Sequence, residues 1–284
     1  MYRELVLAFR SLFKKGRNNH IKMLSLAVGL AMGLVLIAKI YFEQTFDNFY
    51  PDGDRIYHLS ENFTMPDKEE PGSHNRVSGG VVVGMREEIP EVEAGTRYTN
   101  VGLSDAVFYT TEDRRSYSGN FILADSCLFD VLPRPVISGD VKETLSRPMY
   151  AIISKTIADK IGGDVIGRTI EMDTYPGKVM TIGAVFEDIP ENSHYRYDIA
   201  VSLSSIGNFM GDGSLNWLGN DRYMAYVRLS KGIASESITG SMREMQERHQ
   251  PMEKMKEMGI DIFYTLNPLL TIHSADENVK RMSV

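Results

Sequence analysis

One long apolar run dominates the pattern of hydrophobic and polar positions. Residues 23–42 read MLSLAVGLAMGLVLIAKIYF, twenty residues in which Lys39 is the one charge. A helix of this length extends about 30 Å, which matches the hydrocarbon core of a bilayer. Lys39 lies near the end of the run, where its ammonium group can reach the membrane interface. The pattern predicts a transmembrane helix over 23–42; the alternatives are a buried core helix and a cleavable signal peptide.

The charges on either side of this run predict its orientation. Residues 1–22 carry six basic side chains against Glu4, whereas residues 43–54 carry four acidic side chains and no basic one. Because positive charge stays on the cytoplasmic side, we expect the N-terminus inside and everything after Phe42 outside. The basic region is long for a signal peptide, and no Ala-x-Ala exit follows the apolar run. We therefore expect a retained anchor.

Two smaller patterns belong to this part of the chain. Tyr2, Leu5 and Phe9 recur at helical spacing, opposite basic residues, so residues 1–22 are predicted to form an amphipathic helix along the inner leaflet. The alternative is a short disordered tail. The residues of the predicted cytoplasmic anchor are Arg3, Arg10, Lys14, Lys15 and Arg17. Within the apolar run a stripe of small residues, spaced four apart, is the candidate helix-packing surface: Ser25, Gly29 and Gly33.

Beyond residue 43, short strand-like and helical patterns alternate. Arg168–Asp173 and Val179–Phe186 bracket a Tyr-Pro-Gly-Lys turn, which predicts a hairpin. Ser154 is expected to cap a short helix through Ile161, and Ser235 to cap a second helix. Other expected strands are 55–63, 97–100, 106–110, 117–123, 150–153, a half-buried strand over 223–229, and an extended run over 262–272. Together these patterns predict an α+β fold with a strand-rich middle.

Composition narrows the functional classes. The chain has 284 residues, 43% of them hydrophobic, and a net charge of −7. This apolar content excludes global disorder, and the acidic balance argues against nucleic-acid binding. The single cysteine, Cys127, excludes an intrachain disulfide framework.

Searches for catalytic and metal-binding patterns find none. The chain has no GxxxxGK[ST] phosphate loop, and its six histidines are scattered without an HExxH motif. Asp47, Asp52 and Asp54 are close together, but they follow the predicted membrane exit and include a Pro-Asp-Gly turn, so we expect an acidic, solvated linker. The sequence therefore predicts no enzyme activity and no catalytic, cofactor-binding or metal-binding residues.

Several short segments, in this order, resemble FtsX/MacB-type ABC transporter permeases, especially those of the Bacteroidetes. They cover nearly the whole chain, and the ordered set is more specific than any one of its members. The segments are SLAVGLA at 25–31, TFDNFY at 45–50, DRIY at 54–57, IPEV at 89–92, TR at 96–97, DVIGR at 164–168, IGAVF at 182–186, AYVRL at 225–229 and LLTIH at 269–273.

The resemblance implies a two-lobed extracytoplasmic domain at 43–284. A porter-like α/β lobe would comprise 43–119 and 201–284, and an inserted, mostly β lobe would comprise 120–200. It also implies three further membrane helices, so we expect this chain to be an N-terminal fragment of a longer permease. The expected location is a bacterial inner membrane, with the main domain in the periplasm. The expected partners are a cytoplasmic ATP-binding subunit, a second permease copy or homologous permease, and the lipid bilayer.

Three functional hypotheses follow. The first is a permease subunit of the mechanotransmission type, in which ATP hydrolysis by a separate subunit drives a periplasmic conformational change or substrate extrusion. The second is a single-span sensor or interaction module with an extracytoplasmic binding domain. The third, a membrane-anchored hydrolase, lacks any recognisable catalytic constellation.

Overall fold

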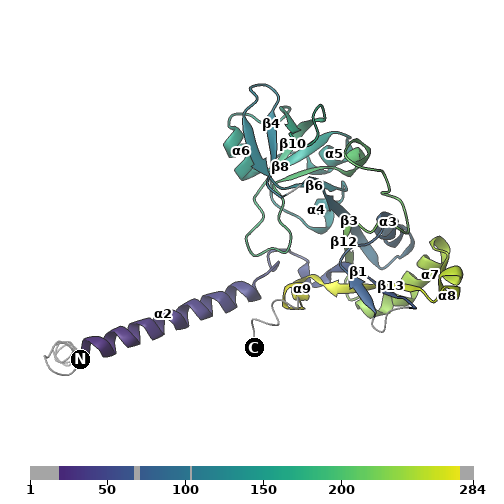
Figure 1. Ribbon diagram of the computed structural model, residues 1–284, viewed down its shortest axis with the longest axis horizontal. Coiled ribbons are helices and arrows are strands. Elements are labelled where there is room, and N and C mark those ends of the chain that lie inside the picture. The colour runs from purple at the N-terminus through teal and green to yellow at the C-terminus, as the bar shows by residue number, and fades with distance from the viewer. Residues whose placement is uncertain (1–18, 67–70, 103, 276–284) are drawn as a thin grey trace. The chain divides into compact units, whose positions relative to one another are not determined.

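The computed structural model describes residues 19–66, 71–102 and 104–275 (Figure 1). The chain divides into two units, Met1–Phe46 and Asp47–Val284. Most of the predicted amphipathic helix over 1–22, including all five basic anchor residues, lies outside the described residues. The positions predicted to span the membrane are described in full.

The first unit contains helix α2 (Asn19–Gln44), which includes the whole predicted span. Its 26 residues extend about 39 Å at the usual helical rise. Large apolar side chains along it, such as Leu26, Leu34 and Val35, are about two-thirds exposed. The segment from Ile21 to Gln44 is long and apolar enough to cross a membrane, and none of it is buried as a core helix would be. The helix therefore has the length, composition and exposure expected of a membrane span.

The second unit is organised by one mixed sheet. In the described residues 13 strands join it, in the order β13-β1-β12-β3-β6-β11-β8-β10-β9-β4-β5, with β2 beside β1 and β7 beside β10. Most neighbours are antiparallel, but β6 and β11 are parallel, as are β8 and β10. The strands are β1 (Ile56–Thr64), β2 (Gly72–His74), β3 (Val92–Asn100), β4 (Ala106–Thr110), β5 (Ser116–Gly119), β6 (Phe121–Ala124), β7 (Val136–Gly139), β8 (Tyr150–Ser154), β9 (Thr169–Met172), β10 (Val179–Phe186), β11 (Ile199–Ser202), β12 (Met224–Leu229) and β13 (Asp261–Pro268).

Short helices cover the sheet, as Figure 1 shows. Helices α3 and α7 pack over β3, β12 and β13, whereas α4, α5 and α6 pack around β3, β8 and β10. The helices are α3 (Gly79–Glu88), α4 (Leu128–Val131), α5 (Val141–Ser146), α6 (Lys155–Ile161), α7 (Thr239–His249), α8 (Met252–Glu257) and α9 (Leu269–Ala275), with 3-10 turns η1 (Gly53–Arg55), η2 (Leu203–Asn208) and η3 (Ser235–Ile238). A single apolar helix followed by this mixed unit confirms the predicted fold class.

The hydrophobic core surrounds the middle of the sheet. Strands β6, β8 and β11 are buried along most of their length, and successive residues of β8 belong to different clusters. Ile152 packs with Leu145 and Phe186, while Ile153 packs with Ile157 and Phe121 on the opposite face. A third cluster, around Leu59, Val82 and Met245, lies beneath α3 and α7. Burial on both faces explains why these strands read as short continuous apolar runs.

Local sequence signals predicted several elements correctly. The Tyr-Pro-Gly-Lys segment joins β9 to β10, which pair in antiparallel fashion as predicted. Ser154 caps α6, and its hydroxyl accepts a hydrogen bond from the backbone N–H of Ile157. The sheet pairing does not test the two predicted lobe boundaries. Strands β4 and β5 join the sheet through β9, and pairing is continuous from β3 to β6, so the division at 119/120 and 200/201 stays a prediction.

Three expectations were wrong. Ser235 caps no helix but begins the 3-10 turn η3, and α7 starts four residues later. The extended run over 262–272 ends at Pro268, where α9 begins. The half-buried pattern predicted for β12 fails at one position, because Tyr226 is 2% exposed on the face expected to be solvated, where Met224 and Arg228 are partly exposed. The burial of Tyr226 has a tertiary cause, because its ring packs against Tyr98 and Tyr195 from segments distant in the sequence.

Candidate functional site at the start of the second unit

The segment that follows helix α2 begins with a buried carboxylate. We call residues 47–55 the junction. The Asp47 side chain is fully buried. The Ser193 hydroxyl donates to Asp47 Oδ1 at 2.7 Å, and His194 Nδ1 contacts Oδ2. The Asp47 N–H also donates to the carbonyl of Asn192 at 2.9 Å. A buried carboxylate is tolerated only with such partners, so Asp47 fixes the start of the junction to the 192–194 loop.

This geometry corrects the prediction of a solvated acidic linker. Asp54 is exposed, as expected, but Asp47 is not, and it adopts a positive φ of 55°. That backbone conformation is uncommon outside glycine, although aspartate tolerates it better than most residues. No local pattern indicates this burial, because His194 is 147 residues away along the chain.

Aromatic side chains also attach the junction to the hydrophobic core. Tyr50 is 4% exposed and stacks on Tyr195 with ring centroids 6.5 Å apart. Tyr195 in turn contacts Tyr98 and Tyr226, at 5.6 and 5.2 Å. Burial raises the pKa of all four phenols, so they stay neutral across the physiological range. The junction therefore rests on rings from β3, β12 and the 192–197 segment.

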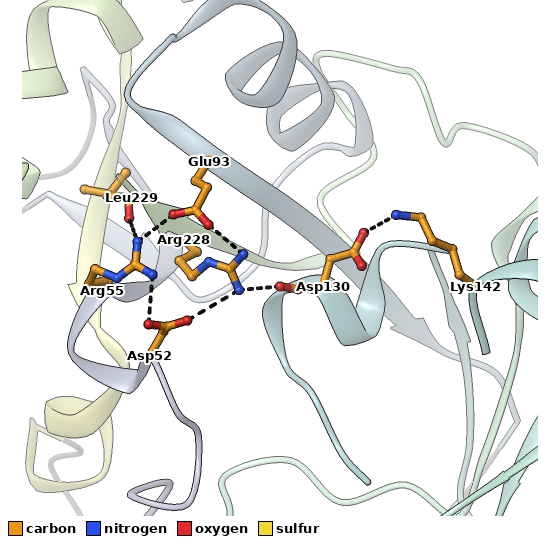
Figure 2. Close-up of polar contacts among 7 residues, drawn as sticks. All are labelled: Asp52, Arg55, Glu93, Asp130, Lys142, Arg228 and Leu229. Carbon is orange, nitrogen blue, oxygen red and sulfur yellow. Dashed lines mark hydrogen bonds and ion pairs between the residues drawn. The ribbon is translucent and has the colours of Figure 1, made fainter. Parts of the chain in front are cut away.

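A charged cluster attaches the other end of the junction, as Figure 2 shows. Arg55 donates to Glu93 Oε2 at 2.6 Å and to the Leu229 carbonyl at 2.7 Å, and it pairs with Asp52 at 2.8 Å. Arg228 contacts the other Glu93 oxygen at 2.9 Å and the Asp130 carbonyl at 2.5 Å. Hydrogen bonds from Arg55 are the largest cause that lowers the pKa of Asp52 and of Glu93. One guanidinium thus connects η1, β3 and β12.

Helix α9, the last described helix, packs against η1 of the junction (Figure 1). Leu269 is fully buried in the same cluster as Tyr50. A β-carbon placed on Gly53 would lie 3.1 Å from Leu270 Cδ2, which shows how closely the two segments approach. His273 meets His194 edge to face, with ring centroids 5.3 Å apart. The beginning of the second unit and the last described residues therefore lie side by side.

A polar cleft of about 620 Å³ lies beside this contact. Its lining includes His194, Asn267 and Thr271, together with His58 of β1. His58 is 3% exposed, and burial lowers its pKa to about 4, so the imidazole is neutral near pH 7. The cleft can hold water or a small polar group next to the junction.

The small-residue stripe predicted from the sequence lies on α2. Ser25, Gly29 and Gly33 share one face because they are spaced four residues apart. A β-carbon on Gly29 or Gly33 would meet no atom within 4 Å in the described structure. Room for a partner helix is therefore present on this face, and the packing itself stays a prediction.

The residues that sequence reasoning missed are those that hold the junction in place. Arg55 and Arg228 occur in segments noted for their family resemblance, DRIY and AYVRL, but no role had been assigned to either. The sequence feature that could have indicated these two residues is an arginine next to a strand or within one. Such an arginine needs an acidic partner when it is partly buried. The partner could not be deduced, because Glu93 reaches Arg55 only through the sheet order.

Solved structures similar to this chain include two from bacterial proteins. A crystallised domain of a protein designated a permease, from Porphyromonas gingivalis, has 36% sequence identity and a TM-score of 0.68, over 77% of this chain and 91% of that one. The periplasmic region of MacB from Actinobacillus actinomycetemcomitans has 13% identity and a TM-score of 0.52, over 82% of this chain and 97% of that one. No family model and no curated protein matches the chain.

The two similarities support different conclusions. Identity of 36% over most of both chains shows common family membership, whereas the MacB likeness shows a common fold. Both agree with an apolar helix followed by a mixed α/β unit. The chain therefore belongs to the FtsX/MacB-type permease family, and its second unit has the fold of the periplasmic domains of that type.

Proposed function

We propose that this chain is a permease subunit of an ABC transporter of the mechanotransmission type. A separate cytoplasmic ATP-binding subunit hydrolyses ATP, and the permease converts that event into a conformational change, or substrate extrusion, in the periplasm. In this proposal the N-terminus is cytoplasmic, α2 crosses the inner membrane, and the second unit is periplasmic. The chain has no catalytic role of its own.

The observation that carries the proposal is the attachment of the junction. Asp47 comes three residues after α2 ends, so no long flexible linker separates the apolar helix from the sheet. Asp47 and Arg55 fix the two ends of the junction to the 192–194 loop and to β3 and β12. A displacement at the end of α2 would thus act on packed strands. Contiguous packing of this kind is one physical means by which coupling passes between distant sites.

Partner contacts are proposed on α2 and before it. The stripe of Ser25, Gly29 and Gly33 would pack against a helix of a second permease copy or of a homologous permease. The basic residues from Arg3 to Arg17 would lie at the inner leaflet, near the ATP-binding subunit. These placements support coupling because they put both protein partners on the part of the chain that precedes the junction.

Orientation can be tested with single cysteines. Leu215 is 67% exposed, so Leu215→Cys in a Cys127→Ser background gives a surface thiol on the second unit. We expect a membrane-impermeant maleimide to label it in spheroplasts, and to label Lys15→Cys in the same background only after lysis. Cys127→Ser alone is the unlabelled control. Labelling of Lys15→Cys before lysis, with Leu215→Cys protected, would contradict the proposal.

Coupling can be tested with the small-residue stripe. Gly33→Leu fills the proposed packing surface, whereas Ala31→Leu adds similar bulk on the opposite face of α2. Expressed in its native host as part of the full-length permease, the wild-type chain and Ala31→Leu should co-purify with an ATP-binding subunit and support ATP hydrolysis by the complex. Gly33→Leu should reduce that hydrolysis without unfolding the second unit. Absence of any ATP-binding partner for the wild-type chain would refute the function; equal hydrolysis in both variants would refute the assigned surface.

A further inference from the structure

Three potential metal ligands converge on the β1–β2 pair, on the face opposite the polar cleft. Glu61 of β1 lies directly across from His74 of β2, and Asp221 comes from the segment before β12. One ligand atom from each residue lies within 4.8 Å of the others. Ser60 and Asn62 line the cleft, and Glu61 points to the other face because side chains alternate along a strand.

Hydrogen bonds orient the imidazole toward the carboxylates. His74 Nδ1 lies 2.8 Å from the carbonyl oxygen of Arg76, which can only accept, so Nδ1 carries the proton. In the neutral ring Nε2 then holds a lone pair, and it faces Glu61 Oε1 at 3.4 Å. Metal-bound histidines commonly donate one ring N–H to a backbone carbonyl in this way, which leaves the second nitrogen available to the metal.

The two carboxylates are oriented as well. Ser78 is the N-cap residue of α3, yet its hydroxyl makes no cap hydrogen bond and donates to Asp221 Oδ1 instead. Tyr264 lies across from Glu61 and is hydrogen-bonded to it, while Gln250 donates to the Tyr264 hydroxyl at 2.8 Å. Outer contacts of this kind hold ligand oxygens in fixed positions and are typical of metal sites.

The charges of the cluster are not balanced by basic residues. Within the described residues, neither Glu61 nor Asp221 forms an ion pair with a lysine or arginine, although Glu61 is only 4% exposed. Other carboxylates of the unit, such as Glu93 and Asp125, do have arginine partners. Two carboxylates whose oxygens lie within 4.8 Å of each other repel one another unless a proton or a metal cation lies between them.

We propose that Glu61, His74 and Asp221 bind a first-row transition-metal dication, for which Zn²⁺ is the probe. One nitrogen and two oxygen ligands suit Zn²⁺ and leave coordination positions for water, whereas Mg²⁺ and Ca²⁺ prefer oxygen ligands throughout. Asp221 is exposed, so the ion has a path from solvent. The bound ion would join β1 and β2 to the segment that leads into β12. The proposal does not depend on the transport function.

The test is calorimetric titration of ZnCl₂ and MgCl₂ into the full chain in detergent. We expect one Zn²⁺ per chain and much weaker Mg²⁺ binding. His74→Ala and Asp221→Asn should each weaken Zn²⁺ binding at least tenfold, and Glu61→Gln should do the same while preserving side-chain shape. Co²⁺ absorption in the visible range should report nitrogen ligation in the wild type and lose that signature in His74→Ala.

His249→Ala is the matched control. Its imidazole contacts a carboxylate, Glu88, that is already paired with Arg248, so removal should leave Zn²⁺ affinity unchanged. Circular dichroism establishes that each variant is folded. No Zn²⁺ binding by the wild type, equal affinity in His74→Ala and wild type, a loss in His249→Ala as large as in His74→Ala, or equal Mg²⁺ affinity would each overturn the proposal.

Discussion

Asp47 illustrates how one polar residue can determine where a chain enters a domain. Its carboxylate is buried, and its partners are a serine hydroxyl and a histidine ring from one loop. Hydrophobic contacts alone would allow the junction to slide, since apolar packing is not directional. A buried, hydrogen-bonded carboxylate permits few alternative positions, because each of them would leave it unpaired.

Removing this carboxylate should destabilise the second unit. Asp47→Ala leaves the Ser193 hydroxyl and the His194 ring without their acceptor in a buried position, which typically costs about 2–4 kcal/mol. Asp54→Ala, at an exposed position of the same junction, should change the free energy of unfolding by less than about 0.5 kcal/mol. Urea unfolding followed by circular dichroism compares them, and equal stabilities would show that the Asp47 contacts contribute nothing.

His58 predicts a pH dependence of stability. Burial, and to a lesser degree the nearby His194, lower its folded-state pKa to about 4 from the ordinary 6.5, although a backbone contact with Asn75 opposes them. Below pH 6.5 the unfolded chain binds the proton that the folded chain excludes. Stability from this group is therefore complete above pH 6.5 and is lost as the pH falls toward 4, by about 3 kcal/mol in all.

His58→Leu isolates that contribution. The variant keeps an apolar side chain against the Tyr226 ring but cannot take up a proton. Its free energy of unfolding should decline less steeply than that of the wild type between pH 6.5 and 4. Urea midpoints of the wild type and His58→Leu measured across this pH range test the prediction. If the two curves of stability against pH are parallel, the acid sensitivity belongs to other groups.

At the scale of elements, the sequence predicted what neighbouring residues determine. The β9–β10 hairpin and the Ser154 cap of α6 depend on contacts within a few residues, and both were predicted. The placement of β3 between β12 and β6 depends on strands far apart in the chain, so no local pattern shows it. For the same reason the local pattern indicated a solvated linker at Asp47, and it could not show that Glu61, His74 and Asp221 lie close together.

The contact between η1 and α9 gives a prediction at this scale. Gly53 is buried, and a β-carbon there would lie 3.1 Å from the end of the flexible Leu270 side chain, with the Asp47 carbonyl oxygen at an ordinary contact distance of 3.8 Å. Gly53→Ala should thus be tolerated, whereas Gly53→Leu should push α9 away and cost about 1–3 kcal/mol. Hydrogen exchange over 269–275 should rise in the second variant. Adding Leu270→Ala should restore much of the protection, and failure to do so would mean that the two segments are independent.

At the scale of the whole molecule, the second unit has its first and last described segments at one place. The junction and α9 share a hydrophobic cluster through Tyr50 and Leu269, and His194 contacts both Asp47 and His273. A displacement of residue 47 would therefore act on α9 and on the sheet at the same time. This arrangement suits a unit that changes pose as a body more than one that bends internally.

Replacing Arg55 should weaken the attachment of the junction to β3 and β12 without unfolding the second unit. Arg55→Lys keeps the charge, but an ammonium group cannot reach Asp52, Glu93 and the Leu229 carbonyl together as the guanidinium does. If the chain acts in the proposed complex with an ATP-binding subunit, we expect Arg55→Lys to keep that subunit bound and the second unit folded, while ATP hydrolysis by the complex becomes less sensitive to the conformation of the second unit. Lys142→Arg, in an exposed pair with Asp130 at the edge of the same cluster, should behave as the wild type. Measuring the ATP hydrolysis of the reconstituted complex with each variant tests the role, and unchanged coupling in Arg55→Lys would mean that the cluster is purely structural.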